Sequence, residues 1–120
     1  MARFVDGFVV PVKKKKYKDY VKMAKKAGKL WKEYGALEYV ECVADDVHQG
    51  KVTSFPRSVK LKKDEIVVFA YIVYKSRKHR DSLLKKIMQD ERLKKMCTPG
   101  KAPFDPMRMF WGGFKTIVEA

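Results

Sequence analysis

Cysteine, long apolar runs and acidic residues are all scarce in this sequence. Neither of the two cysteines, Cys42 and Cys97, has a Cys or His neighbour at metal-ligand spacing. We therefore expect buried or incidental thiols in a reducing cytoplasm, with no disulfide framework. The longest uncharged apolar run, residues 66–74, has nine residues, under half of the roughly 20 that a membrane-spanning helix needs. No export signal is visible, because Asp6 and Pro11 interrupt the N-terminal apolar stretch.

Acidic residues number 14 against 28 Lys and Arg, which gives the 120-residue chain a net charge of +14. This excess permits an anionic partner without requiring one, since net charge governs solubility and encounter rather than fold. Apolar residues make up 46% of the chain, enough to form a core without disulfides or a structural metal. We expect one domain over 1–120, too short for a kinase, a TIM barrel or an α/β-hydrolase.

Changes in hydrophobic periodicity divide the chain into strands and helices. Steps of three and four between apolar residues indicate one long amphipathic helix, and Gly35 follows it at the position of a left-handed cap. Ser76 is a candidate N-cap for a second helix whose apolar residues extend to Leu93, while Gly112 and Gly113 in the last strand indicate a bulge or a close approach. In chain order, the predicted strands cover 4–12, 36–44, 66–74 and 107–118, and the helices cover 13–34 and the segment after Ser76.

The order β-α-β-β-α-β predicts an α+β, ferredoxin-like fold with an antiparallel sheet and both helices on one face. The strand over 66–74 is apolar on both faces, which is typical of a strand buried on both sides. No element of the chain is left to cover the second face, so we expect a second copy to do so. The segment 45–64 lacks clear periodicity and is long for a connection, which indicates a role of its own.

Six segments spread along the chain match a known sequence pattern: VDGFVVPV (5–12), GALEYVECVADD (35–46), GKVTSFP (50–56), VVFAYIVYKSRKHRD (67–81), PFD (103–105) and GGF (112–114). Together they resemble the YbaA-like family of uncharacterised bacterial proteins. The resemblance implies a dimeric α+β barrel, in which two ferredoxin-like subunits press their sheets together, and it implies no established activity. The first helix of this chain departs from the family in being unusually rich in lysine.

A basic cluster at the start of the second helix is the first candidate site. Arg77, Lys78, His79 and Arg80 occupy a helical turn in which acidic residues are favoured. An anionic ligand near His79 and Arg80 would compensate for this, with His79 as the acid–base residue and Trp31 as a pocket-lining residue. An internal ion network is the other interpretation, and its candidate partners are Glu38, Glu41, Asp45 and Asp46.

Two other sites compete with that cluster. Asp45, Asp46 and His48 have the side chains of a metal site, but their spacing matches no defined one and we predict neither a metal nor a cofactor. Residues 69–74 resemble the aromatic part of an RNA-recognition signature, and Phe4 is a candidate for another base-stacking ring. A dimer would bury the same sheet face, so the two uses exclude each other.

The lysine face of the first helix, formed by Lys18, Lys22, Lys25, Lys29 and Lys32, is a candidate surface for weak, salt-dependent nucleic-acid binding. The sequence thus leaves three functions open. These are a homodimeric barrel that binds or transforms a small anionic ligand, an RNA-binding module, and a structural or regulatory dimer without a ligand.

Overall fold

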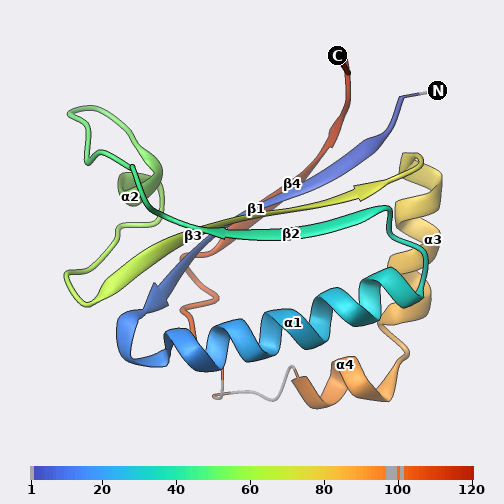
Figure 1. The fold of residues 1–120 in the computed structure, drawn as a ribbon, viewed down its shortest axis with the longest axis horizontal. Helices are drawn as coiled ribbons and strands as arrows, with labels where there is room; N and C mark the ends of the chain where they lie inside the picture. The colour runs from blue at the N-terminus through green and yellow to red at the C-terminus, as the bar shows by residue number, and fades with distance from the viewer. Residues whose placement is uncertain (1, 97–99, 101) are drawn as a thin grey trace.

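The computed structural model describes residues 2–96, 100 and 102–120, so Cys97 lies outside the described residues. A four-stranded antiparallel sheet forms its centre (Figure 1). Its strands are β1 (Phe4–Lys13), β2 (Glu38–Val43), β3 (Glu65–Tyr74) and β4 (Phe110–Lys115), in the spatial order β2-β3-β1-β4. This order and the β-α-β-β-α-β connection confirm the predicted ferredoxin-like α+β fold.

Three helices lie on one side of the sheet and one short helix on the other (Figure 1). After a 3₁₀ turn at Lys14–Lys16, α1 (Tyr17–Glu33) crosses the sheet, followed later in the chain by α2 (Phe55–Ser58), α3 (Arg77–Ile87) and α4 (Glu91–Met96). None of these helices, within the part of the chain that the structure describes, is long and apolar enough to cross a membrane.

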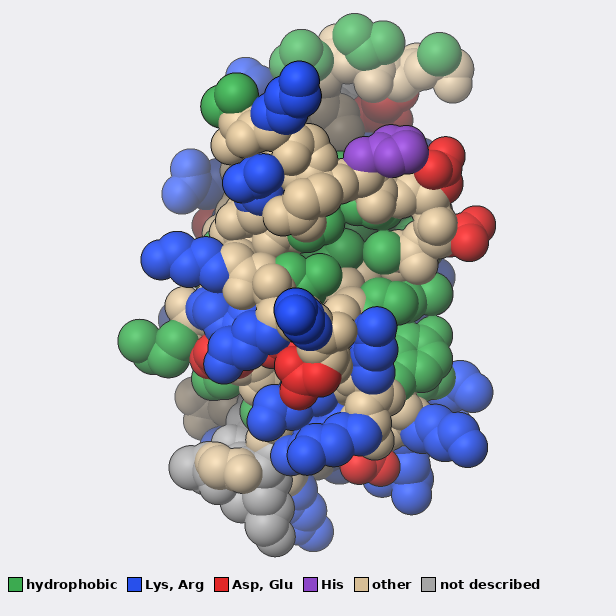
Figure 2. Space-filling view, turned by 90° about the vertical axis from the view of Figure 1, so that its left-hand side faces the viewer, with side chains coloured by type: hydrophobic (Ala, Val, Ile, Leu, Met, Phe, Trp, Pro, Cys, Tyr) green, Lys and Arg blue, Asp and Glu red, His purple; other side chains and the backbone are tan. Residues whose placement is uncertain are grey.

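Helix α1 follows the apolar stripe of the sequence. Tyr20 and Leu30 are buried against the sheet, and Gly35 ends the helical segment with φ +110°, a conformation that favours glycine. The predicted lysine face is confirmed as solvent-exposed, and Figure 2 shows Lys and Arg side chains gathered on the half of the molecule that α1 occupies.

The second amphipathic segment forms two helices, where the sequence predicted one. Ser76 caps α3 as expected, since its side chain accepts a hydrogen bond from the His79 N–H at 3.1 Å. The chain then turns at Met88, which is 54% exposed. Asp90 causes the break because its carboxylate accepts from the Arg92 N–H at 2.8 Å and so starts α4.

The last strand is shorter than predicted because a turn replaces its first residues. Asp105 accepts a hydrogen bond from the Met107 N–H at 2.9 Å and another from Arg108 Nε at 2.8 Å. Gly113 lies in regular register opposite Asp6, so there is no bulge here. A Cβ at Gly113 would lie 2.5 Å from the Phe4 ring, so the glycine marks a close approach.

The two sheet faces differ in how they are covered. The face under α1, α3 and α4, which we call the helix face, carries most of the core. The opposite, open face is covered at one end by the segment 45–64, where Val59 packs against Val9 and Val67. This corrects the expectation that no element of the chain covers this face and gives the loop a structural role. The remaining open face keeps exposed aromatic rings, with Phe69, Phe110 and Phe114 at 42%, 47% and 65% exposure.

Candidate functional site

A cavity of about 430 Å³ lies between the helix face of the sheet and helices α1 and α4. Strand alternation directs Phe8, Val10, Ala70 and Ile72 into this space, because residues two apart share a face of the sheet. The walls are mostly apolar side chains, among them Met23, Ala27, Leu93, Met96, Phe104 and Met109. A space of this size and composition suits a small, largely apolar molecule.

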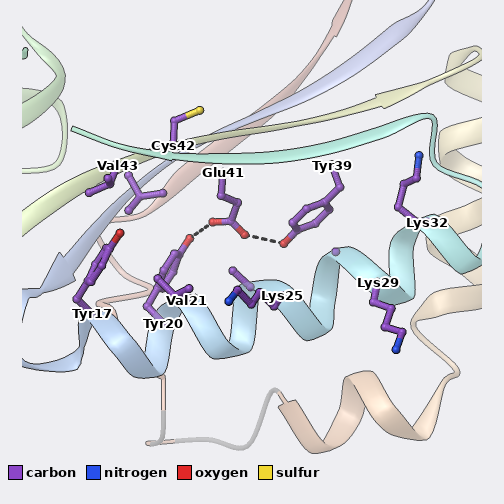
Figure 3. A pocket seen from close by; sticks show the side chains of 13 residues that line it. Tyr17, Tyr20, Val21, Lys25, Lys29, Lys32, Tyr39, Glu41, Cys42 and Val43 are labelled. Atoms are coloured by element: carbon purple, nitrogen blue, oxygen red, sulfur yellow. Dashed lines mark hydrogen bonds between the residues drawn. The ribbon is translucent and has the colours of Figure 1, made fainter. Parts of the chain in front are cut away.

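A cluster of polar groups enters the cavity wall where β2 faces α1. Glu41 lies opposite Ala70 on the helix face and points between two tyrosine side chains (Figure 3). The Tyr20 hydroxyl donates to Glu41 Oε1, and the Tyr39 hydroxyl donates to Oε2 at 2.7 Å. Burial and the adjacent Glu41 charge raise the pKa of both tyrosines, so both hydroxyls stay protonated and continue to donate.

A second polar group occupies the other end of the core. Trp31 lines the cavity, and its Nε1 donates to the Tyr74 hydroxyl at 3.1 Å. Tyr74 also lies beside Asp6, whose side chain is only 2% exposed. Burial raises the Asp6 pKa, while the charge of Arg80 acts in the opposite direction. Arg80 Nε lies 3.5 Å from Asp6 Oδ1, and its guanidinium carbon is 4.7 Å from the centre of the Phe4 ring.

The structure separates the predicted site residues. Trp31 lines the cavity, whereas Arg77 is exposed at the surface and pairs with Asp81 at 3.7 Å. Arg80 pairs with Asp6 and, at 3.2 Å, with Asp81. The internal ion network therefore exists with Asp6 and Asp81, and its predicted partners from residues 38–46 were wrong.

His79 is held by its local structure at the start of α3. Its Nδ1 accepts a hydrogen bond from the Lys75 N–H at 3.1 Å, and its ring packs edge-on against Tyr74. Its Nε2 faces Gly35 at the end of α1. His79 and Trp31 thus both contact Tyr74, and the role of His79 in acid–base chemistry stays a prediction.

Two further predictions concern the surface. Phe4 was predicted as a base-stacking ring, but it is only 7% exposed and packs in the helix-face core. That part of the RNA interpretation is wrong. Asp46 and His48 lie 3.4 Å apart with side chains about 90% exposed, and the described residues contain no group of three potential metal ligands. Cys42 is a free, exposed thiol on the open face of β2.

Sequence reasoning missed Glu41 and Asp6 as site residues. Glu41 was considered only as a possible ion-pair partner of the basic cluster, and Asp6 only as an interruption of the N-terminal apolar stretch. The missed signal was the alternation of side chains along a strand, in which residues two apart share a face. Glu41 shares its face with Tyr39, and Asp6 shares its face with Phe4 and Phe8. An acidic residue on the apolar face of a strand must find a partner in the core.

Comparison with known proteins agrees with this architecture. The family described as "Protein of unknown function (DUF1428)" matches residues 3–106. The "Uncharacterized protein YbaA" of Escherichia coli K12 is 48% identical over 117 residues, which cover 98% of each chain, and that of Shigella flexneri matches equally well. The chain belongs to the DUF1428 family. This confirms the YbaA-like resemblance, and the family description assigns no activity.

Solved structures with low sequence identity share the DUF1428 fold seen here. A dimeric ferredoxin-like protein from an uncultured marine organism has a TM-score of 0.63 at 10% identity and covers all of both chains. A protein of unknown function from Bacteroides thetaiotaomicron, described as a possible oxidoreductase, has a TM-score of 0.60 at 10% identity and covers 96% of this chain and 97% of its own. At these identities the likeness establishes the fold alone.

Proposed function

We propose that the chain is a homodimeric barrel in which each subunit binds a small molecule in the cavity between α1 and the sheet. The observation that carries the proposal is the Glu41 carboxylate, held by two tyrosine hydroxyls at the wall of an otherwise apolar cavity. Placing a carboxylate there costs solvation free energy that an apolar residue would not. A binding role for the cavity explains why a charged group lies in its wall.

The homodimer follows from the open face of the sheet. Phe69, Phe110 and Phe114 are exposed on the same side, and the loop 45–64 covers only one end of it. An exposed apolar patch of this kind is typical of a protein–protein interface. A second copy is the partner we propose, because a solved structure with the same fold is described as a dimeric ferredoxin-like protein.

This site differs from the anionic-ligand site predicted at Arg77, His79 and Arg80. The Arg80 charge faces two carboxylates, and His79 Nδ1 is engaged by a backbone N–H. These contacts support a structural role for the basic cluster, and we therefore propose the cavity as the better candidate for a binding site. The anionic ligand stays a prediction. It is tested by comparing the affinity for inorganic phosphate of the native chain with that of its His79→Ala variant.

Nucleic-acid binding through α1 is the second candidate function. The observation in its favour is the continuous exposure of lysines along this helix, joined by Lys26. Such a surface gives affinity that falls steeply with salt. Titration with labelled RNA at physiological salt tests it: submicromolar binding that is lost when Lys22 and Lys29 are changed to Glu supports this function, and its absence means that these lysines only solvate the helix.

The cavity is tested by filling it. Ala27 lines the cavity, whereas its neighbour Lys26 is exposed on the outer face of α1. We expect Ala27→Phe to abolish binding of toluene. Binding is measured by the shift of the Trp31 indole N–H signal in NMR spectra. Lys26→Phe adds the same ring outside the cavity and should leave binding unchanged. Equal toluene binding by both variants, or no toluene binding by the native protein, would contradict the proposal.

A further inference from the structure

Tyr20, Glu41 and Tyr39 form a wall between two spaces, which we call the Tyr–Glu–Tyr wall. The same three residues line the inner cavity and an outer groove of about 460 Å³ between α1 and β2. In Figure 3, Glu41 points from β2 toward α1 and its two dashed hydrogen bonds lead to the tyrosines on either side. The wall therefore supplies the polar surface that a molecule in the inner cavity would meet.

The hydrogen-bond donors at this wall are already used. A protonated tyrosine has one O–H donor, and both tyrosines give theirs to Glu41. The carboxylate has about four acceptor positions, of which two are occupied by the tyrosine hydroxyls. Each phenol oxygen can still accept a hydrogen bond. What remains at the wall is acceptor capacity.

The other polar side chain on the helix-facing lining is also committed. The Trp31 N–H donates to Tyr74 and not into the cavity. Tyr71, which also borders the cavity, belongs to the open face by strand register, opposite Gly7. Among the described lining residues, the side chains that face the helices thus offer acceptors to a ligand and no uncommitted donor.

We propose that Glu41 selects the ligand: the cavity takes a small molecule with an apolar body and an O–H or N–H donor, which it places on the Glu41 carboxylate. This inference rests on the proposed binding function and adds the chemistry of the ligand. An anionic group would lie against the carboxylate without a side-chain donor to satisfy it. Three lysines, Lys25, Lys29 and Lys32, line the outer groove and not the inner cavity.

Four ligands with one ring and different head groups test the inference: toluene, benzyl alcohol, benzylamine and benzoate. We expect the native protein to bind benzyl alcohol and benzylamine about tenfold more tightly than toluene, because a hydrogen bond to the half-buried Glu41 carboxylate is charge-assisted. Benzoate should bind weakest. Dissociation constants come from NMR titration of the Trp31 indole signal.

Two isosteric variants distinguish the effect of a charge change in the Tyr–Glu–Tyr wall from that of the same change elsewhere on β2. Glu41→Gln should lower benzylamine affinity to about that of toluene, and leave toluene binding within about twofold of the native value. Glu38→Gln makes the same charge change on the same strand, but Glu38 lies opposite Val73 on the open face, so it should have no effect. The native ligand series tests the inference by itself if Glu41→Gln does not fold.

The outcomes distinguish the two proposals. Toluene binding that is lost in Ala27→Phe, combined with equal or tighter binding of benzoate than of benzylamine, would refute the role of Glu41 and keep the cavity. Failure of all four ligands to bind would refute the cavity itself. A preference for benzylamine that persists in Glu41→Gln would show that another group receives the donor and would also overturn the inference.

Discussion

Changing Arg80 to alanine should destabilise the fold in the absence of any ligand. Arg80 links α3 to β1 through Asp6, and their side chains are 15% and 2% exposed. Its guanidinium also packs over the Phe4 ring at 4.7 Å. The alanine variant leaves the Asp6 carboxylate in the core beside the Tyr74 hydroxyl, with the negative charge of Asp81 no longer offset by Arg80. An isolated buried charge is far more costly than a paired one.

The magnitude follows from this burial. Removing one partner of a buried ion pair costs about 3 kcal/mol or more, a large part of the roughly 5–15 kcal/mol that stabilises a typical domain. For a chain of this length the loss corresponds to a fall in Tm of about 10 °C. Arg77→Ala is the matched control, because Arg77 lies on the same helix with a side chain 76% exposed. Its surface pair should contribute about 0.5 kcal/mol or less.

The assay is urea unfolding followed by circular dichroism at fixed protein concentration, repeated across pH. Burial raises the Asp6 pKa above its usual value of 3.8 in the folded protein. The folded state therefore holds this proton to higher pH than the unfolded chain, and ionisation lowers stability as pH rises from 3.8 toward the raised pKa. Without Arg80, the pH range over which Asp6 ionisation lowers stability extends to higher pH. Asp6→Asn abolishes this pH dependence of stability. An Arg80→Ala variant as stable as Arg77→Ala, with unchanged pH dependence, would refute the reasoning.

Two other predictions concern the open face and the turn before β4. Phe114→Glu should convert the proposed dimer to a monomer in sedimentation at micromolar concentration, whereas Val52→Glu, at a side chain 92% exposed outside the sheet, should not; a monomeric native protein would contradict the proposed dimer. Glu65, with a side chain 1% exposed, accepts from Arg108 at 2.8 Å, and this hydrogen bonding lowers its pKa. Its contribution is therefore present above the unfolded pKa of 4.5 and lost as pH falls through the lowered value. Glu65→Gln should cost about 2 kcal/mol at pH 7 and progressively less as pH falls below 4.5; a loss that does not change with pH would argue against the ion pair.

Local patterns were sufficient to predict the main elements. The stripe on α1, the Ser76 cap and the apolar character of β3 each depend on residues near in sequence, and the structure confirms them. The errors occurred where a polar side chain competes with backbone periodicity. Asp90 splits the second amphipathic segment, and Asp105 with Arg108 replaces the start of the last strand by a turn.

The candidate site was less accessible to sequence reasoning. Arg80 and His79 stood out as charges at an unfavourable helix position, but such a signal does not identify the partner. Asp6 reaches Arg80 because β4 carries Gly113 opposite Asp6, where a side chain would collide with Arg80 and Phe4. This arrangement depends on the register of three chain segments that are far apart in sequence.

By itself, the sequence determined the order of strands and helices, the lysine surface of α1 and the excess of apolar surface on the sheet, because hydrophobic periodicity is a local property of the chain. Only the tertiary structure decided that Glu41 lies between Tyr20 and Tyr39 and that the loop 45–64 covers one end of the open face. Both depend on where α1 and the loop cross the sheet. That crossing is set by side-chain packing over the whole core, which no single segment encodes.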